Sequence, residues 1–349
     1  MATQPCATLP APGRTGAARL LALLSALTAP WHAASAATAI PLHRHARDHW
    51  APAAYEVVVF HRGELTSTAQ ARIEALDQAR AATPVNATLR TIDLAGPMDS
   101  SMETLWEAQE QARPPWVIVR APDVSPEADP VWTGPLDSPT VDHLFDSPAR
   151  RRLVERLQQG AAAVWVLLEC GETPRDEAAV DALSAGLRAL ERNPPIGTPG
   201  PQPAFGLVRV TRNEPAEEFF VSLLEHGQAA ATALPLAFPV FGRGRILGAL
   251  AGRDIDAEGI RAASALLLAP LGEGRPGRPG RDLLIAADWI GGRRSPSPAA
   301  NPAPATPGTR TPSVRESNQT NWKAWVGALL GVTGAVGGWM WLARQRRTA

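Results

Sequence analysis

The stretch LPLAFPVFGRGRILGALAG, residues 234–252, decides the fold. Pro235 opens an apolar run that predicts a buried strand over 234–242, and a second apolar run predicts a strand over 246–252. The Gly-Arg-Gly sequence at 242–244 provides the backbone freedom of a tight turn, so the two strands are expected to form an antiparallel hairpin. A doubly wound parallel sheet would instead place a helix here, because parallel neighbours need a crossover. The hairpin therefore favours a mixed sheet.

Working outward from this hairpin, short apolar runs alternate with amphipathic segments over residues 51–290. Strands are predicted at 55–62, 87–95, 116–122, 131–136, 162–169, 205–212, 234–242, 246–252 and 281–289. Helices are predicted at 66–82, 102–112, 139–159, 174–193, 215–227 and 256–269, with a break in the third near Pro148. The order β-α-β-α-β-β-α therefore occurs twice, which predicts two α/β domains, 51–160 and 161–290.

This repeated order resembles the thioredoxin fold, and it does so through the order of elements and the placement of prolines rather than through residue identity. Pro235 stands where the resemblance implies the active-site cis-proline, and Pro115 would be its counterpart in the first half. The resemblance implies tandem thioredoxin-like domains. The alternative is a doubly wound α/β sheet, which short alternating elements also build.

The stretch VWVLLECGETPRDEAA, residues 164–179, carries the candidate site. In thioredoxins the first strand leads into C-x-x-C at a helix N-terminus, which activates the first thiol. By this resemblance Cys170 would stand at the attacking position and Thr173 where the second cysteine would be. Such a C-x-x-T thiol could form mixed disulfides but could not resolve them internally.

A structural role explains the same residues without thiol chemistry. Thr173 is expected to be the N-cap of a helix with Pro174 at its first position. Cys170 would then be a small apolar residue at the end of a strand. Glu169, Glu172 and Asp176 surround it in sequence, and nearby carboxylates favour the neutral thiol. Slow, ordinary alkylation of Cys170 is therefore expected.

The N-terminus has the pattern of a secretory signal, with Arg14 and Arg19 ahead of a short apolar run and small residues at Ala34 and Ala36. Cleavage after Ala36 would remove residues 1–36 and with them the chain's other cysteine. The mature chain could then form no internal disulfide.

The C-terminal end predicts a membrane anchor. Residues 291–318 are rich in Pro, Ser, Thr and Ala and predict a disordered stalk. Residues 325–343 carry no charge and are long enough for one transmembrane helix, and the Arg-rich tail 344–349 indicates a cytoplasmic end. Spaced glycines on this segment could form a dimer face, namely Gly327, Gly331, Gly334 and Gly338. An alternative is a C-terminal sorting signal, although no L-P-x-T-G sequence precedes it.

Composition and motifs exclude several function classes. Lys plus Arg and Asp plus Glu both number 34, so no global charge recruits nucleic acid. The chain has no P-loop, G-x-G-x-x-G, H-E-x-x-H or G-x-S-x-G motif, and no cofactor is predicted. His43, His45 and His49 could bind a metal, but a polar, mobile start of the mature chain over 37–50 is the favoured interpretation. His61 and Glu64 are weak candidates for acid/base work.

These patterns predict a binding or scaffold protein rather than an enzyme. We expect it in a bacterial inner membrane, held by a single span, with the bulk of the chain outside the cytoplasm and an envelope protein as its partner. The alternative is an envelope monothiol protein that forms mixed disulfides through Cys170.

Overall fold

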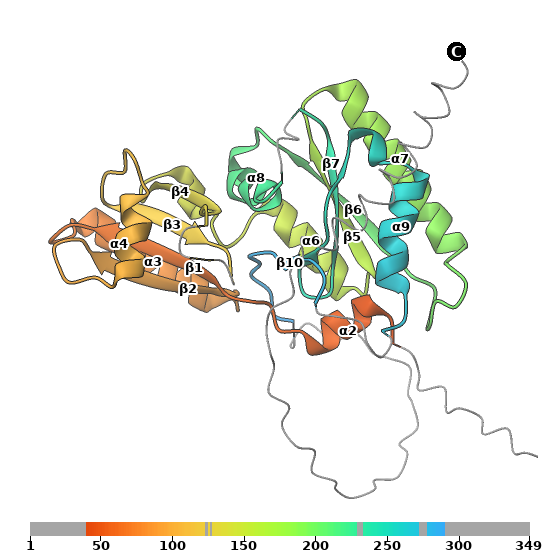
Figure 1. The fold of residues 1–349 in the computed structure, drawn as a ribbon, viewed down its shortest axis with the longest axis horizontal. Helices are drawn as coiled ribbons and strands as arrows, with labels where there is room; N and C mark the ends of the chain where they lie inside the picture. The colour runs from red at the N-terminus through yellow and green to blue at the C-terminus, as the bar shows by residue number, and fades with distance from the viewer. Residues whose placement is uncertain (1–39, 123–124, 126–127, 229–232, 272–277, 290–349) are drawn as a thin grey trace, which may run out of the picture. The chain divides into compact units, whose positions relative to one another are not determined.

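The structure is a computed structural model that describes residues 40–122, 125, 128–228, 233–271 and 278–289. It is a mixed α/β fold with two mixed β-sheets (Figure 1). No helix within the described ranges is long and apolar enough to span a membrane. The predicted signal peptide 1–36, stalk 291–318, membrane span 325–343 and tail 344–349 lie outside these ranges.

The elements of the first half are α2 (Leu42–His49), β1 (Tyr55–His61), α3 (Ser67–Ala82), β2 (Ala87–Asp93), α4 (Ser100–Glu107), β3 (Trp116–Arg120), β4 (Trp132–Pro135), α5 (Pro139–Asp142) and α6 (Pro148–Gln158). Those of the second half are β5 (Ala163–Glu169), α7 (Thr173–Arg192), β6 (Phe205–Thr211), η2 (Pro215–Glu217), α8 (Glu218–Glu225), β7 (Leu236–Phe241), β8 (Arg245–Ile246), β9 (Leu250–Ala251), η3 (Gly252–Asp254), α9 (Ala257–Leu268) and β10 (Arg281–Asp282). The helix break predicted near Pro148 is confirmed, because α5 and α6 are separate.

The first sheet has the strand order β2-β1-β3-β4. β1 is parallel to β2 and antiparallel to β3, and β3 is antiparallel to β4. Successive side chains of a strand point to opposite faces, and both faces of β1 are buried. Val57 and Val59 face the main core, whereas Val58 and Phe60 pack under α4 with Met102. The unbroken apolar run of β1 follows from this burial on both faces.

The second sheet has the order β10-β8-β7-β5-β6, and β9 also pairs with β7. Its strands β6-β5-β7-β8 repeat the order and the directions of β2-β1-β3-β4. Every residue of β5 is buried. Trp165 and Leu167 lie in a cluster with residues of α7 and α9, while Val164 and Val166 belong to the main core.

The main core is shared between the two halves of the chain. One cluster of buried residues contains side chains from β1, β3 and α3 of the first half and from β5, β6 and α8 of the second. Helix α6 packs against β5 and β6, and its Leu153 and Leu157 are buried in this core. The Arg156 side chain of α6 packs closely on Gly206 of β6. A Cβ atom added to Gly206 would lie only 2.9 Å from Arg156 Cδ. The last helix predicted for the first half therefore covers the second sheet.

The expectation of a mobile segment over 37–50 is wrong from Leu42 onward, where α2 forms. Leu42 and Ala46 are four residues apart and so share one helix face, and both are buried against Phe241 and Leu267. Two apolar residues are enough to pack this helix on the core because they lie on the same helix face.

The fourth strand of the second half, predicted as continuous over 246–252, is interrupted between β8 and β9. Val240 pairs with Ile246 and Ala237 with Leu250, so three steps along β7 oppose four on its partner. Pro239 lies in this interval and has no N–H to donate to the ladder. The extra residue forms a bulge opposite this proline.

The last strand predicted at 281–289 is wrong beyond Asp282. Leu283 donates its N–H to Gly244 O, but Ile285 N donates to the Asn86 side chain and Ala287 N to Pro84 O. The segment leaves the second sheet and runs along the first half, and it is apolar because it is buried there.

Candidate functional site

Cys170 lies where β5 ends, beside the start of β7. Leu168 pairs with Leu236 in this antiparallel pair, so the register places Cys170, two residues further on, level with Leu234. Cys170 is a free thiol and is half-buried. The structure therefore brings Cys170 to the same sheet edge as Pro235.

The loop at Cys170 is held by Asp176 from the first turn of α7. The Asp176 carboxylate accepts hydrogen bonds from Cys170 N at 2.8 Å and Gly171 N at 2.9 Å. Gly171 has φ +91°, a conformation that glycine adopts without strain. Asp176 is itself buried, so its charge is compensated by these backbone N–H groups and serves to fix the loop.

The N-cap prediction for Thr173 is wrong by one residue. Thr173 is the first residue of α7, and Glu172 is the N-cap without a side-chain capping bond. In the first turn the Arg175 and Asp176 N–H groups donate to Glu172 O at 2.9 and 3.0 Å and Pro174 has no N–H, which leaves no need for a Thr cap. Pro174 is at the second helical position, where a missing N–H costs no hydrogen bond.

Glu169, the last residue of β5, is bound by its neighbours on β6. Its carboxylate accepts hydrogen bonds from Arg209 Nε at 2.5 Å and from Thr211 Oγ1 at 2.8 Å. The hydrogen bond to Glu169 is the main cause that raises the pKa of Arg209. Arg212 donates through Nη1 to the Glu169 carbonyl at 2.9 Å and through Nε to Glu225 at 2.8 Å. The acids around Cys170 thus have structural partners.

The two prolines differ in their peptide bonds. The Pro114-Pro115 bond is cis, whereas the cis bond that the resemblance implied before Pro235 is not present. A trans bond is the default for any residue before proline. Pro115 O accepts a hydrogen bond from Leu136 N, and Pro235 O accepts one from Gly252 N.

The corresponding edge of the first sheet carries His61 beside Pro115. Phe60 pairs with Trp116, so His61 is level with Pro115. His61 Nδ1 lies 2.8 Å from Gly63 O in its own loop, and Gly63 N donates to Asp93. Hydrogen bonds from the Ala95 and Gly63 N–H groups lower the pKa of Asp93. Glu64 is exposed, and no hydrogen bond joins it to His61.

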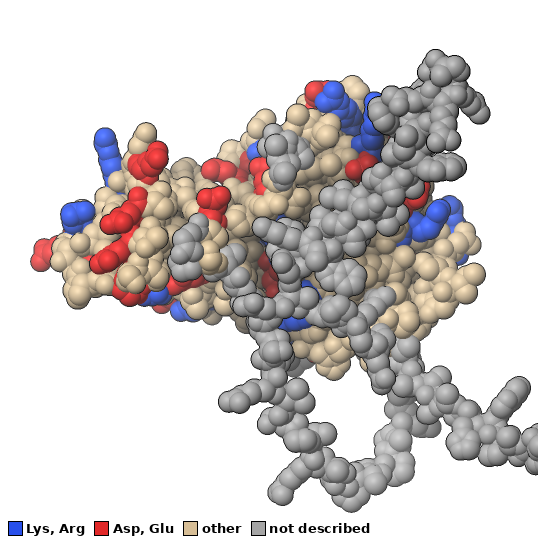
Figure 2. All heavy atoms as spheres, in the orientation of Figure 1, with Lys and Arg blue, Asp and Glu red and all other residues tan. Residues whose placement is uncertain are grey.

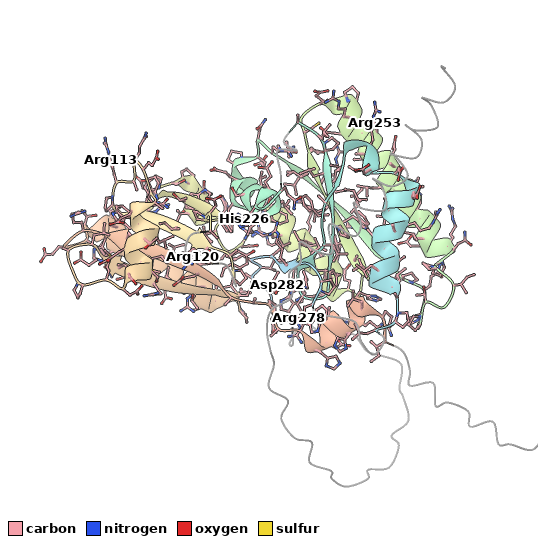
Figure 3. All side chains as sticks on the ribbon, viewed as in Figure 1. Arg113, Arg120, His226, Arg253, Arg278 and Asp282 are labelled. Carbon is pink, nitrogen blue, oxygen red and sulfur yellow. The ribbon has the colours of Figure 1, made fainter. Side chains whose placement is uncertain are left out.

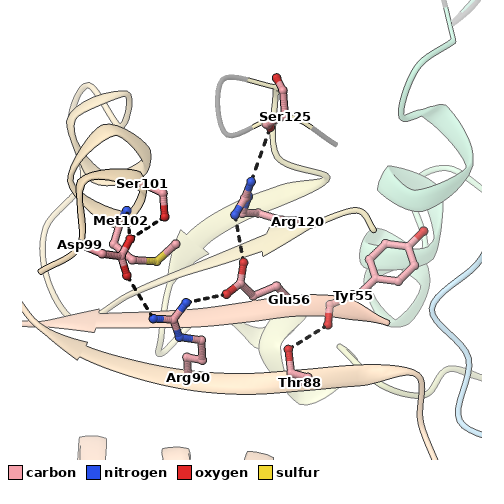
Figure 4. Close-up of polar contacts among 9 residues, drawn as sticks. All are labelled: Tyr55, Glu56, Thr88, Arg90, Asp99, Ser101, Met102, Arg120 and Ser125. Carbon is pink, nitrogen blue, oxygen red and sulfur yellow. Dashed lines mark hydrogen bonds and ion pairs between the residues drawn. The ribbon is translucent and has the colours of Figure 1, made fainter. Parts of the chain in front are cut away.

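Sequence analysis missed a charged network on the outer face of the first sheet (Figure 4). Glu56 accepts hydrogen bonds from Arg90 Nη1 at 3.0 Å and from Arg120 Nη1 at 2.9 Å. Arg120 is mostly buried, and its Nε has no hydrogen-bond partner among the described residues. The available signal was a charged residue inside each of three apolar strands. Such residues can share a face only where strands pair in register, which a single sequence does not give.

The described residues contain no group of three or more His, Cys, Asp or Glu side chains placed to hold a metal ion. The rings of His45 and His49 are tilted against each other, with 4.6 Å between their centroids. His43 Nδ1 instead lies 3.0 Å from the Leu267 carbonyl, so this nitrogen carries the proton. Burial lowers the pKa of His43 to about 4.

Comparison with known proteins adds no family. No family model matches the chain, and a search of curated proteins found no match. The geometry at Cys170 offers a single half-buried thiol whose neighbouring acids hold the loop and the adjacent strand. Within the described residues, no second cysteine lies beside this thiol.

Proposed function

We propose that the chain is a membrane-anchored binding or scaffold protein whose two halves are thioredoxin-like and have no dithiol chemistry. Residues 325–343 would hold it in a bacterial inner membrane, and the described part would lie outside the cytoplasm at the end of the stalk 291–318. An envelope protein would be its partner, and the glycines at 327–338 would be a further contact between two anchors.

The strand order supports the thioredoxin-like part of this proposal. The strand order β2-β1-β3-β4 of the first sheet has its equivalent in β6-β5-β7-β8 of the second sheet, with the same strand directions. Both place a proline beside the end of the first strand, Pro115 and Pro235. The trans bond at Pro235 and the packing of α6 on the second sheet depart from the resemblance.

The observation that carries the binding role is that the carboxylates around Cys170 are engaged in structural hydrogen bonds. Asp176 is bound to the backbone of the Cys170 loop, and Glu169 is bound to Arg209 and Thr211. A carboxylate that acts as a general base must reach the thiol, and these two are held by other groups. These carboxylates therefore fix the shape of the loop and the strand at this edge and do not transfer a proton.

One observation favours the monothiol alternative. Cys170 is only half-buried, and it lies at the sheet edge where a partner could approach. A thiol in this position could exchange with a disulfide of the partner. The result would be a mixed disulfide that persists until an external thiol releases it.

Disulfide trapping in intact membranes separates the two roles. Full-length wild type, Cys170→Ser and the matched control Cys6→Ser would be oxidised mildly, blocked with N-ethylmaleimide and analysed on non-reducing gels. The binding role predicts that all three variants capture the same partners and that no reducible adduct depends on Cys170. An adduct present in wild type and Cys6→Ser but absent in Cys170→Ser would establish the alternative.

A further inference from the structure

One end of the molecule gathers arginines around helix α2. The α2 surface is defined here by the side chains of Arg44, Arg243 and Arg278, with Trp50, the C-cap of α2, beside Arg278. Arg243 Nε donates to Arg47 O at 2.7 Å, and Arg278 Nη2 donates to Ala51 O at 2.5 Å. The Arg278 and Arg245 guanidinium groups lie 5.3 and 5.6 Å from the Trp50 ring centroid.

Among the described residues, no Asp or Glu carboxylate lies within ion-pair distance of the three arginines that define this surface, Arg44, Arg243 and Arg278. The backbone carbonyls that accept from Arg243 and Arg278 satisfy N–H groups of these guanidiniums but carry no net charge, so these hydrogen bonds do not neutralise them. Elsewhere many arginines are paired, as Arg90 is with Glu56 and Arg209 with Glu169.

Acidic side chains are most frequent at another part of the surface. Figure 2 shows acidic side chains gathered over the first sheet and α4. There Glu103 and Glu107 lie four residues apart on α4 and are exposed, and Glu110, after the end of the helix, is exposed as well. The separation of charge gives the molecule an end that an anionic surface would select.

The described chain enters and leaves at the same edge as the α2 surface. Leu42 and Ala46 pack with Ala163, where β5 begins. Gln158, which precedes β5, donates its side-chain N–H to Asp288 O at 3.0 Å. Residue 40 follows the predicted signal sequence, and residue 289 precedes the predicted stalk and anchor. Cys170 lies at the opposite edge, where β5 ends.

We propose that the α2 surface docks onto the anionic phospholipid headgroups of the membrane that holds the anchor. This inference rests on the proposed membrane anchoring. Guanidinium groups bind phosphate through paired hydrogen bonds, and basic residues next to a membrane segment are attracted to anionic lipids. A Trp side chain between arginines suits the interface between water and lipid. Docking in this orientation would turn the edge with Cys170 away from the membrane, toward a partner.

The test uses the full chain in lipid nanodiscs, either of phosphatidylcholine alone or with about one third phosphatidylglycerol. A fluorophore is placed at the exposed position His49→Cys, with Cys6→Ser and Cys170→Ser. The readout is quenching by acrylamide, which is neutral and reaches only the aqueous side. We expect roughly twofold less quenching in the anionic discs, with the difference removed at about 0.5 M salt.

Two triple variants decide which arginines matter. Arg44→Gln, Arg243→Gln and Arg278→Gln together should abolish the difference between the discs. The matched control neutralises three exposed arginines that lie outside the α2 surface, Arg62, Arg113 and Arg253, and should leave the difference unchanged. Figure 3 shows Arg278 near α2 and Arg113 and Arg253 away from it.

The contradicting outcomes are distinct. Equal quenching in both discs, or equal effects of the two triple variants, would overturn docking and leave the anchor standing. Failure of the chain to enter any disc would contradict the anchor and docking together. Heparin could also be added to the neutral discs. If it reduced acrylamide quenching as much as anionic lipid does, the surface would bind a soluble polyanion, and membrane docking would be overturned.

Discussion

Single buried polar residues hold the joint between the two halves. Glu217 is buried, and its carboxylate accepts hydrogen bonds from Ser147 Oγ and Ala149 N, both at 2.6 Å, at the start of α6. Arg150 is fully buried nearby and donates to Leu144 O at 2.9 Å. Burial lowers the pKa of Arg150 to about 10, and the Glu217 charge opposes this shift. These groups fix the position of α6 because a buried polar atom without a partner is costly.

Replacing Glu217 should therefore destabilise the fold far more than replacing its neighbour. Glu217→Ala leaves the Ser147 hydroxyl and the Ala149 N–H without an acceptor and should lower the free energy of unfolding by about 2 to 4 kcal/mol. Glu218 is exposed and accepts one hydrogen bond from Thr140, so Glu218→Ala should cost about 1 kcal/mol or less. Urea unfolding of both variants measures the difference, and equal losses would refute this role for Glu217.

His43 should make stability depend on pH. Burial lowers its folded pKa from 6.5 to about 4, so between these values the unfolded chain binds a proton that the folded chain does not. Stability from this residue is complete above about pH 6.5 and is lost as pH falls toward 4, by up to about 3 kcal/mol. His43→Gln should reduce the pH dependence of the urea midpoint between pH 7 and 4.5, whereas His49→Gln, at an exposed position, should not. The same slope in His43→Gln and wild type would contradict this assignment.

At the scale of elements, α6 decides how the halves depend on each other. The helix follows the first sheet in sequence but packs on β5 and β6, and α8 of the second half contacts β4. A cut between 160 and 161 would therefore expose Leu153 and Leu157 of α6 and open the shared core. Apolar surface of this kind contributes about 25 cal/mol per Å² on burial.

The fragment 51–160 should not fold alone. Circular dichroism should show no cooperative thermal transition for it, because α6 has lost the sheet on which it packs. The matched fragment 40–289, which keeps both sheets and α2, should unfold in one transition, since one core links them. A cooperative transition of 51–160 comparable to that of 40–289 would contradict the shared core.

Most strands of both sheets are predictable from sequence, and the reason is local. Strands such as β1 and β5 are unbroken apolar runs, so burial on both faces marks them without any tertiary information. The segment 283–287 is equally apolar, but its burial comes from a path between the halves that no local pattern specifies. The outer network at Glu56 depends on register across three strands. Cys170 was placed correctly at a strand end, whereas the support by Asp176 depends on how α7 turns back.

On the scale of the whole molecule, the described part has two contrasting ends. The α2 surface is basic and adjoins both points where the described chain begins and ends. The opposite edge carries Cys170 with its loop held by Asp176. If the predicted anchor and stalk hold, one end faces the membrane and the other a partner.

Protease accessibility in spheroplasts tests the central claim, which is a single-span protein with its bulk outside the cytoplasm. The full chain would carry an epitope tag after Ala349, and protease would be added outside before and after detergent. The account predicts loss of the full-length band without detergent and a short tagged fragment, containing 325–349, that stays in the membrane. A full-length band that survives until detergent is added would place the described part inside the cell and contradict the account.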